Sequence, residues 1–171
     1  MILILFLILI VGLLSGCSNN TKTAIVLKNP QPTNNSNQMV TENDYFKIKF
    51  NPIYDMGLRG IKATITNKVD DTLKINWNEG SFVTPDNQAS RAIPGNVSFI
   101  DISKKIPNTI IPSGAKSEII IAPEKNIYKS DAYVGSIDYE NNSTFSILFP
   151  IIIDNEKKEF RYDFEIKIYD N

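Results

Sequence analysis

The chain has 171 residues, a formal net charge of −1, no histidine and a single cysteine. The balanced charge leaves no excess of Lys and Arg to neutralise phosphates, so we expect no nucleic-acid partner. The missing histidine removes Ser–His–Asp and Cys–His catalytic sets and the usual zinc and iron ligand sets. No glycine-rich phosphate loop is present, and one cysteine cannot form an intramolecular disulfide. We therefore expect no metal and no cofactor.

The N-terminal residues are almost wholly apolar. Ile2 to Leu14 is interrupted only by Gly12, and no Lys or Arg precedes the run. A helix of this length reaches about 20 Å, which is short of the roughly 30 Å hydrocarbon core of a bilayer. The length is typical of the hydrophobic region of a signal peptide rather than of a membrane span.

The apolar run ends in Leu14-Ser15-Gly16-Cys17. This segment resembles the lipobox of bacterial lipoproteins. The resemblance implies that residues 1–16 are a signal peptide, that Cys17 receives a diacylglycerol, and that the membrane is a partner through this lipid. Ser18 in place of Asp implies the outer membrane in a diderm host, and otherwise the outer face of the cytoplasmic membrane. The alternatives are an ordinary signal peptide cut elsewhere and an uncleaved apolar anchor.

Residues 17–44 are polar and rich in Asn, Thr, Ser and Gln. Such a composition buries too little apolar surface to fold alone, so we interpret the segment as a lipidated N-terminus followed by a flexible tether. Ala24 to Leu27 is the exception. These four residues are either an edge strand of the domain or a short apolar stretch within the tether, and we favour the tether.

Residues 45–171 form the predicted domain, and their dominant hydrophobic period is two. Alternation of apolar and polar side chains puts one face of a strand on a core and the other in water. The segments with this pattern are 46–50, 61–65, 73–77 and 160–168. The pattern predicts an all-β, antiparallel sandwich of seven or eight strands.

Turns and continuous apolar runs complete the domain. The segments 67–71 and 154–158 have the composition of hairpin turns, and Pro112-Ser113-Gly114 is typical of a turn with a glycine at positive φ. A short helical turn is expected near residues 124–130. The runs 119–121 and 147–153 indicate strands buried on both faces or strands at a subunit contact. Pro150 predicts an edge strand or a bulge in the second run.

Two segments carry a second resemblance. Gly60 to Lys68 followed by Asp70 to Ile75 is similar to a strand–turn–strand unit of immunoglobulin-like envelope modules, and Ile110 to Gly114 is similar to the turn before their mid-domain strand. The resemblance implies an immunoglobulin-like β-sandwich of the kind found in uncharacterised envelope lipoproteins. It implies a fold and no activity, because such sandwiches carry many unrelated functions.

The remaining candidates for chemistry are carboxylates. Asp131, Asp138 and Glu140 flank two tyrosines and form either a solvated loop or an acid pair for glycoside hydrolysis, which needs carboxyl groups about 5–9 Å apart. Asp70-Asp71 forms either a turn or part of a calcium site. In both cases we favour the structural interpretation.

Four residues mark a possible binding surface: Trp77, Arg91, Tyr133 and Tyr139. Trp77 is in phase with Leu73 and Ile75, which favours the core over a surface ring that stacks on sugar. Arg91 either binds an acidic partner or pairs with a carboxylate or carbonyl that holds a loop. We expect a non-catalytic envelope module that binds or scaffolds a protein or glycan. The alternatives are a carboxylate-dependent enzyme on envelope glycan, a periplasmic inhibitor and a surface adhesin.

Overall fold

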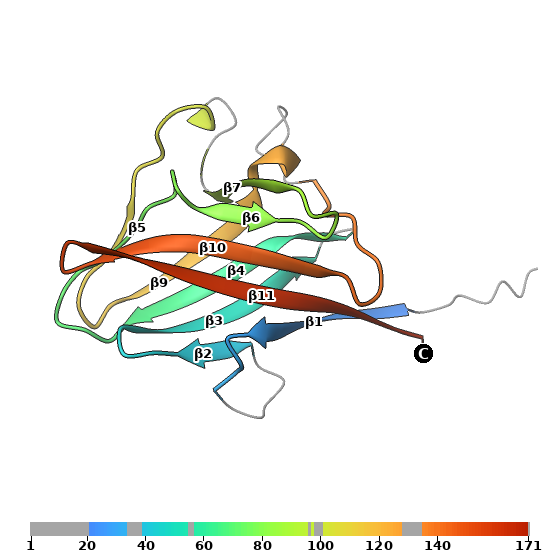
Figure 1. Ribbon diagram of the computed structural model, residues 1–171, viewed down its shortest axis with the longest axis horizontal. Helices are drawn as coiled ribbons and strands as arrows, with labels where there is room; N and C mark the ends of the chain where they lie inside the picture. Colours follow the sequence, from blue (N-terminus) through green and yellow to red (C-terminus); the bar gives the residue numbers. More distant parts are fainter. Residues whose placement is uncertain are drawn as a thin grey trace, which may run out of the picture.

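The protein is an all-β structure in which every pairing between strands is antiparallel (Figure 1). The computed structural model describes residues 21–33, 39–54, 57–95, 97, 101–127 and 135–170. The described elements are β1 (Thr21–Asn29), β2 (Val40–Glu42), β3 (Phe46–Tyr54), β4 (Leu58–Asn67), β5 (Leu73–Ile75), β6 (Ser81–Val83), β7 (Ala89–Pro94), β8 (Thr109–Ile111), β9 (Lys116–Pro123), the 3₁₀ helix η2 (Glu124–Asn126), β10 (Thr144–Ile153) and β11 (Glu156–Asp170). The predicted helical turn is confirmed at η2.

The strands form one sheet that curls over on itself. Their order is β1-β11-β10-β6-β7-β9-β4-β3-β2, with β5 paired to β10 and β8 paired to β5. The first half of β7 pairs with β6 and its second half with β9, so this strand passes from one arm of the sheet to the other. The all-β, antiparallel prediction is confirmed. The described strands outnumber the predicted seven or eight because β1 and β2 lie in the predicted tether, and because β6 and β8 have three residues each, too few to show a period.

The core lies between the two arms of the curled sheet. The inward residues of β3, β4 and β11 are buried in the alternation that the sequence predicts. Phe50 of β3 meets Tyr162 and Phe164 of β11 edge-on, with ring centroids 4.8 and 5.1 Å apart. Burying such a side chain contributes about 1.5–3 kcal/mol, so these rings hold the arms together.

The predicted hairpin at 154–158 is confirmed, with a tighter turn. β10 and β11 pair from Ile153–Glu156 outward, which leaves Asp154 and Asn155 as a two-residue loop. Both residues have positive φ, at 50° and 61°. Asn and Asp tolerate this conformation, which matches the twist of the strands that the loop joins. The turn at Pro112–Gly114 is also confirmed, with Gly114 at φ 67°.

The predicted hairpin at 67–71 is wrong. β4 pairs with β3 and β9, whereas β5 pairs with β10 and β8, so the segment crosses between the arms. Asn67 holds the crossing: its side-chain amide donates to the carbonyl oxygens of Asp71 (2.7 Å) and Ile111 (3.0 Å). The sequence could not distinguish the two cases, because a polar turn has the same composition in a hairpin and in a connection that crosses between the arms.

The expectations for the apolar runs are partly corrected. Ile120 is 42% exposed, so the run 119–121 is not buried on both faces. Pro150 lies in β10, a strand paired on both sides, rather than on an edge. Its carbonyl accepts from Asn76 N, so its missing N–H faces the gap between the end of β5 and the start of β6. The gap explains why proline is tolerated in a central strand.

The tether prediction for residues 17–44 is wrong for Thr21–Asn29 and Val40–Glu42, which are the strands β1 and β2. β1 pairs with β11 from Thr21–Asp170 to Asn29–Asp163, and it buries Ile25 and Leu27. Two inward apolar side chains are enough to hold β1 because the inward residues of β11 provide the core surface on which they pack. The described part of the fold therefore includes residues from 21 onward, whereas the predicted domain begins at 45. The proposed signal peptide and Cys17 lie outside the described residues.

Candidate functional site

The two ends of the strand order, β1 and β2, lie along the same side of the molecule (Figure 1). We call this side the seam. β1 pairs with β11 only from Asp163 onward, and β2 pairs with β3 only at residues 47–49. The described residues therefore leave one stretch of each long strand uncovered on its seam edge: residues 156–162 of β11 and residues 51–54 of β3. Uncovered strand edges present backbone groups that can pair with another chain.

A groove of about 300 Å³ separates the uncovered edge of β11 from β2. We call it the β2–β11 groove. Its walls are residues 159–162 of β11, residues 41–43 at β2, and Asn29-Pro30 at the end of β1, and Phe46 also lines it. The ring centroids of Phe46 and Phe160 are 4.8 Å apart. Phe46 is buried and Phe160 is half-buried, so the groove combines the exposed part of the Phe160 ring with two strand edges.

The backbone orientation of β11 follows from a pair of hydrogen bonds. Ile166 N donates to Ser143 O, and Ile166 O accepts from Asn142 N, so the backbone groups of Ile166 face the β10 side. The pairing of β10 with β11 is continuous to Glu156. By the two-residue period, the backbone N–H and C=O of Glu159 and Arg161 face the seam. β1 offers them no partner, because its pairing ends at Asp163.

A polar cluster stands beside the groove on the outer face of β11. Asp163 accepts hydrogen bonds from Ser146 Oγ (2.6 Å), Arg161 Nε (2.8 Å) and Asn29 Nδ2 (3.2 Å). Partial burial acts to raise the pKa of Asp163, but these hydrogen bonds together with the charge of Arg161 bring it below its ordinary value. The cluster fixes the end of β1 to β11 at the boundary between the covered and uncovered edges.

Lys158 and Tyr45 lie at the other end of the uncovered edge. The Lys158 ammonium is 5.3 Å from the centroid of the Tyr45 ring, a cation–π distance. Tyr45 in turn meets Phe160 edge-on at 6.4 Å. The pKa of Lys158 is raised by the hydrogen bond between Lys158 and Glu156 and by the nearby Tyr45, so the ammonium is charged at neutral pH. The uncovered edge is therefore bounded by ordered side chains.

A second groove, also of about 300 Å³, lies between β1 and the uncovered end of β3. Phe50 N donates to Met39 O, so the backbone of Pro52, two residues on, faces the seam without a donor. At the mouth of this groove Tyr54 is half-exposed, and burial together with the nearby Tyr139 raises its pKa to about 12. Tyr139 Oη and Thr23 Oγ1 are 3.5 Å apart. Proline makes this edge the poorer one for strand pairing.

The structure separates the four residues of the predicted binding surface. Trp77 is fully buried and its indole Nε1 donates to Thr109 Oγ1 at 2.8 Å, so it cannot stack on a surface ligand. Arg91 donates to Glu124 through Nε (3.1 Å) and Nη2 (2.8 Å), and also to the carbonyl of Ile102. It holds a loop, the second of the two roles considered. Tyr139 lies at the seam. Tyr133 lies outside the described residues.

Two carboxylates of the predicted acid pair, Asp138 and Glu140, lie in the described chain. Asp138 and Glu140 are exposed, and Asp131 lies outside the described residues. Within the described ranges, no three His, Cys, Asp or Glu side chains come together as metal ligands. The same part of the chain contains no helix long and apolar enough to cross a membrane. Asp71 takes part in the β4–β5 turn through its carbonyl, as the turn interpretation requires.

Sequence reasoning missed the seam. Two features of the sequence could have indicated the seam: the isolated alternation of Ile25 and Leu27, and the proline within the apolar end of β3. Neither indicates which partner strand is left uncovered, because that depends on where β1 stops along β11. Register between segments about 140 residues apart is fixed by packing of the whole sheet.

No protein-family model matches the chain, and no curated protein matches it. Among solved structures, the yjhA protein from Bacillus subtilis is similar, with 10% sequence identity and a TM-score of 0.38. The match covers 64% of this chain and 76% of that protein.

Proposed function

We propose that the protein is a lipid-anchored, non-catalytic module of the cell envelope that binds an extended segment of a partner protein along the uncovered edge of β11. The observation that carries the proposal is the end of β1 pairing at Asp163, which leaves residues 156–162 of β11 beside a groove. An extended peptide gains affinity from backbone hydrogen bonds to such an edge and specificity from pockets for alternate side chains.

The contrast between the two uncovered edges supports β11 as the binding edge. Pro52 removes a seam-facing donor from β3, as proteins do where strand addition is disfavoured. Residues 156–162 of β11 contain no proline. Phe160, half-buried and packed on the buried Phe46, provides apolar contact within the same groove, and aromatic side chains are common anchors in protein interfaces.

The fold that we propose for this module is a variant of the immunoglobulin-like sandwich. In immunoglobulin domains, strands A, B, E and D form one sheet, G, F and C form the other, and a buried Trp lies on strand C. The order β3-β4-β9-β7 parallels the first sheet and the order β11-β10-β5 the second. Trp77, buried two residues after β5, is consistent with this assignment.

Lipid on Cys17 and an envelope location are part of the proposal. The support is the lipobox resemblance and the short apolar segment before it. The non-catalytic assignment is supported by the many surface carboxylates that pair with Lys or Arg, such as Glu165 with Lys28 and Glu79 with Lys157.

Site-specific photocrosslinking in living cells tests the proposal. A photoreactive amino acid replaces Glu42, which lines the β2–β11 groove, or Glu118, which is exposed on β9 as the control position. We expect a discrete adduct with an envelope protein at position 42 and none at position 118. Glu159→Pro removes a seam-facing N–H and should abolish the adduct, whereas Glu159→Ala should keep it.

Two results would contradict the proposal. One is an adduct of equal yield at both positions. The other is an adduct at position 42 that survives Glu159→Pro in a protein whose circular dichroism and urea unfolding match those of Glu159→Ala.

A further inference from the structure

β1 begins four positions after Cys17. An extended chain spans at most about 3.3–3.6 Å per residue, so Thr21 stays within about 14 Å of the Cα of Cys17. This step rests on the lipid anchor of the proposed function. A flexible tether of about 25 residues, as residues 17–44 suggested, would give an average separation of roughly 25–30 Å. Docking of β1 therefore removes most of the freedom of the domain relative to its anchor.

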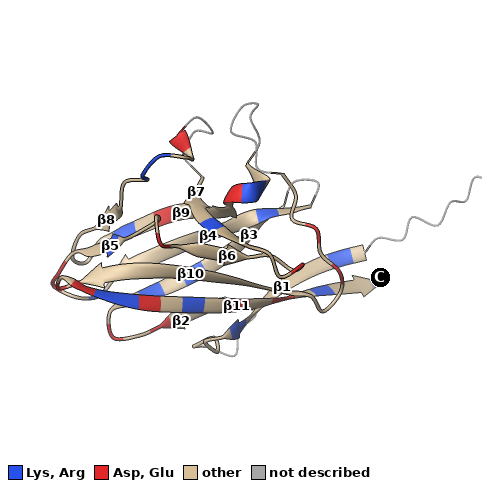
Figure 2. Ribbon diagram, turned by 45° about the horizontal axis from the view of Figure 1, so that its top comes forward, with Lys and Arg blue, Asp and Glu red and all other residues tan. Residues whose placement is uncertain are grey.

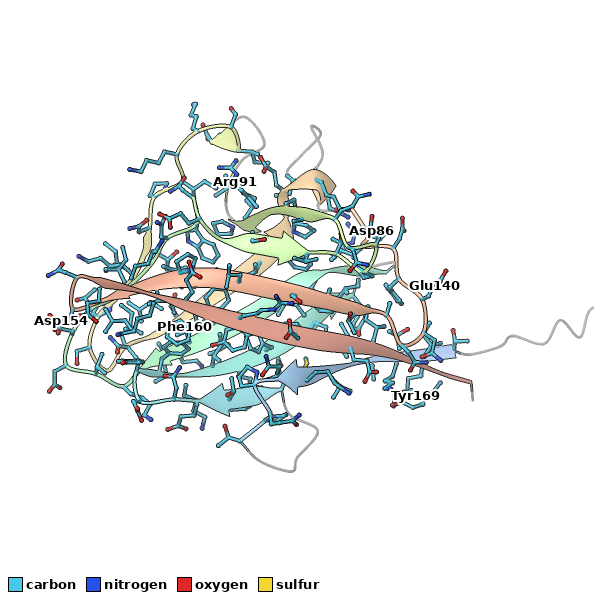
Figure 3. The ribbon with its side chains drawn as sticks, in the orientation of Figure 1. Asp86, Arg91, Glu140, Asp154, Phe160 and Tyr169 are labelled. Carbon is cyan, nitrogen blue, oxygen red and sulfur yellow. The ribbon has the colours of Figure 1, made fainter. Side chains whose placement is uncertain are left out.

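The start of β1 defines one end of the molecule. Thr21 pairs with Asp170 and Lys22 with Tyr169, so both described termini lie together. We call this the tether end, and we call the end with the Asp154–Asn155 turn the far end; Figure 3 shows Tyr169 and Asp154 at opposite ends. β11 joins the two ends with 15 residues, which at 3.3–3.4 Å per residue makes it about 50 Å long.

The tether end presents exposed tyrosines. Tyr169 is 51% exposed, and Tyr54, which lines a groove with Thr23, is 42% exposed. Tyrosine rings favour the boundary between lipid and water because one end is apolar and the other polar. Charge does not determine the contact, because Lys22 and Glu140 give this end both signs.

The long sides of the molecule are poorer surfaces for lipid. Positive and negative residues alternate along β11 (Figure 2). Lys28 pairs with Glu165 at 3.2 Å and Lys157 with Glu79 at 2.8 Å, so these cations are already neutralised. Ile110, which is 62% exposed on β8, is the one large aliphatic side chain near the far end that offers a competing contact among the described residues.

We infer that the domain stands on the phospholipid bilayer that holds its anchor, with Tyr54 and Tyr169 at headgroup level and the far end pointing away. The uncovered edge of β11 starts at Glu156, directly after the far-end turn. The β2–β11 groove is therefore held away from the bilayer by the covered half of β11. A partner reaches it from the space beyond the membrane without displacing lipid.

Fluorescence quenching in vesicles tests this orientation. The lipidated protein, purified from membranes, is reconstituted in phosphatidylethanolamine–phosphatidylglycerol vesicles that carry a headgroup quencher. A fluorescent amino acid replaces Tyr169 at the tether end or Glu156 at the far end. We expect several-fold stronger quenching at position 169. Insertion of about twenty Gly and Ser residues between Asn20 and Thr21 allows a separation of roughly 25 Å and should remove most of that difference.

The outcomes separate this inference from the proposed function. Mass spectrometry of each preparation reports whether Cys17 carries lipid. A chain without lipid overturns the anchor and this orientation together. A lipidated chain with equal quenching at the two positions, or with stronger quenching at position 156, overturns the orientation alone. A difference that persists after the insertion supports the orientation and shows that the exposed tyrosines, rather than the short connection to the anchor, maintain it.

Discussion

The two halves of β11 share one inward pattern and differ at their edges. From Asp163 to Asp170 the edge is covered by β1, and Phe164 and Ile166 are fully buried. From Glu156 to Tyr162 the edge is uncovered, and Phe160 is only half-buried. The same alternation of apolar and charged residues thus serves a closed and an open stretch of sheet. Pairing on the edge, which alternation does not encode, decides whether a stretch completes the core or remains available to a partner.

The largest expected effect comes from removing the strand that covers the first stretch. A chain that starts at Val40 lacks Ile25 and Leu27, whose burial contributes about 1.5–3 kcal/mol each. We expect it to lose about 3–6 kcal/mol of unfolding free energy, which is a large part of the 5–15 kcal/mol of a typical domain. Urea unfolding followed by circular dichroism measures this loss.

A matched pair of substitutions in β1 tests whether the contacts of β1 with the core stabilise the protein. Leu27 is 2% exposed and Val26 is 40% exposed on the opposite face. Leu27→Ala should therefore destabilise the protein by about 2–5 kcal/mol and Val26→Ala by much less. Equal, small effects of both substitutions would restore the interpretation of this segment as a tether.

The next effect compares aromatic residues in the two halves of β11. The Phe164 ring stacks on Phe145 with centroids 4.8 Å apart and is fully buried. Phe164→Ala should cost about 3–5 kcal/mol, as truncation of a buried Phe does. Phe160→Ala should cost clearly less, because the ring already contacts water. Glu165→Ala, on the outer face, is the control and should change the urea midpoint least.

If Phe160→Ala costs as much as Phe164→Ala, the uncovered half is as well packed as the covered half. The contrast between the two edges would then be a matter of hydrogen bonding alone. If Glu165→Ala costs as much as Phe164→Ala, the two-residue period of β11 is wrong.

Much of the fold could be predicted from the sequence because strands with one wet face encode their orientation locally. The inward rows of β3, β4 and β11 and the core position of Trp77 follow from the two-residue period. β1 could not be predicted in this way. Its two inward residues, Ile25 and Leu27, are stabilised by a strand at the opposite end of the chain, and its polar residues have the composition of a tether.

The candidate site could be predicted only in part, for a related reason. Tyr139 is found from its position in an irregular segment, and the structure brings it to the seam. The uncovered edge of β11 has no local signal, because Glu159 and Arg161 follow the same alternation as Glu165 and Lys167. What distinguishes them is the residue at which β1 stops pairing.

The smallest effect concerns Asp163, which marks that boundary. Its hydrogen bonds with Ser146, Arg161 and Asn29 lower its pKa from the ordinary 3.8, despite partial burial. Asp163→Asn should cost on the order of 1 kcal/mol at neutral pH, because charge-assisted hydrogen bonds become neutral ones. A carboxylate with a depressed pKa contributes its stability above the pKa of the unfolded chain. The contribution is lost as the pH falls through the folded value.

The difference in unfolding free energy between the wild type and Asp163→Asn should therefore be constant near neutrality and should shrink as the pH falls below about 4. Urea titrations at a series of pH values measure it, with Asp138→Asn as the control, since Asp138 is exposed and lies outside this cluster. A difference that does not depend on pH would show that the Asp163 charge does not fasten β1 to β11. The boundary between the covered and uncovered edges would then be set by Ile25 and Leu27 alone, and partner binding at the uncovered edge should not respond to acid through this cluster.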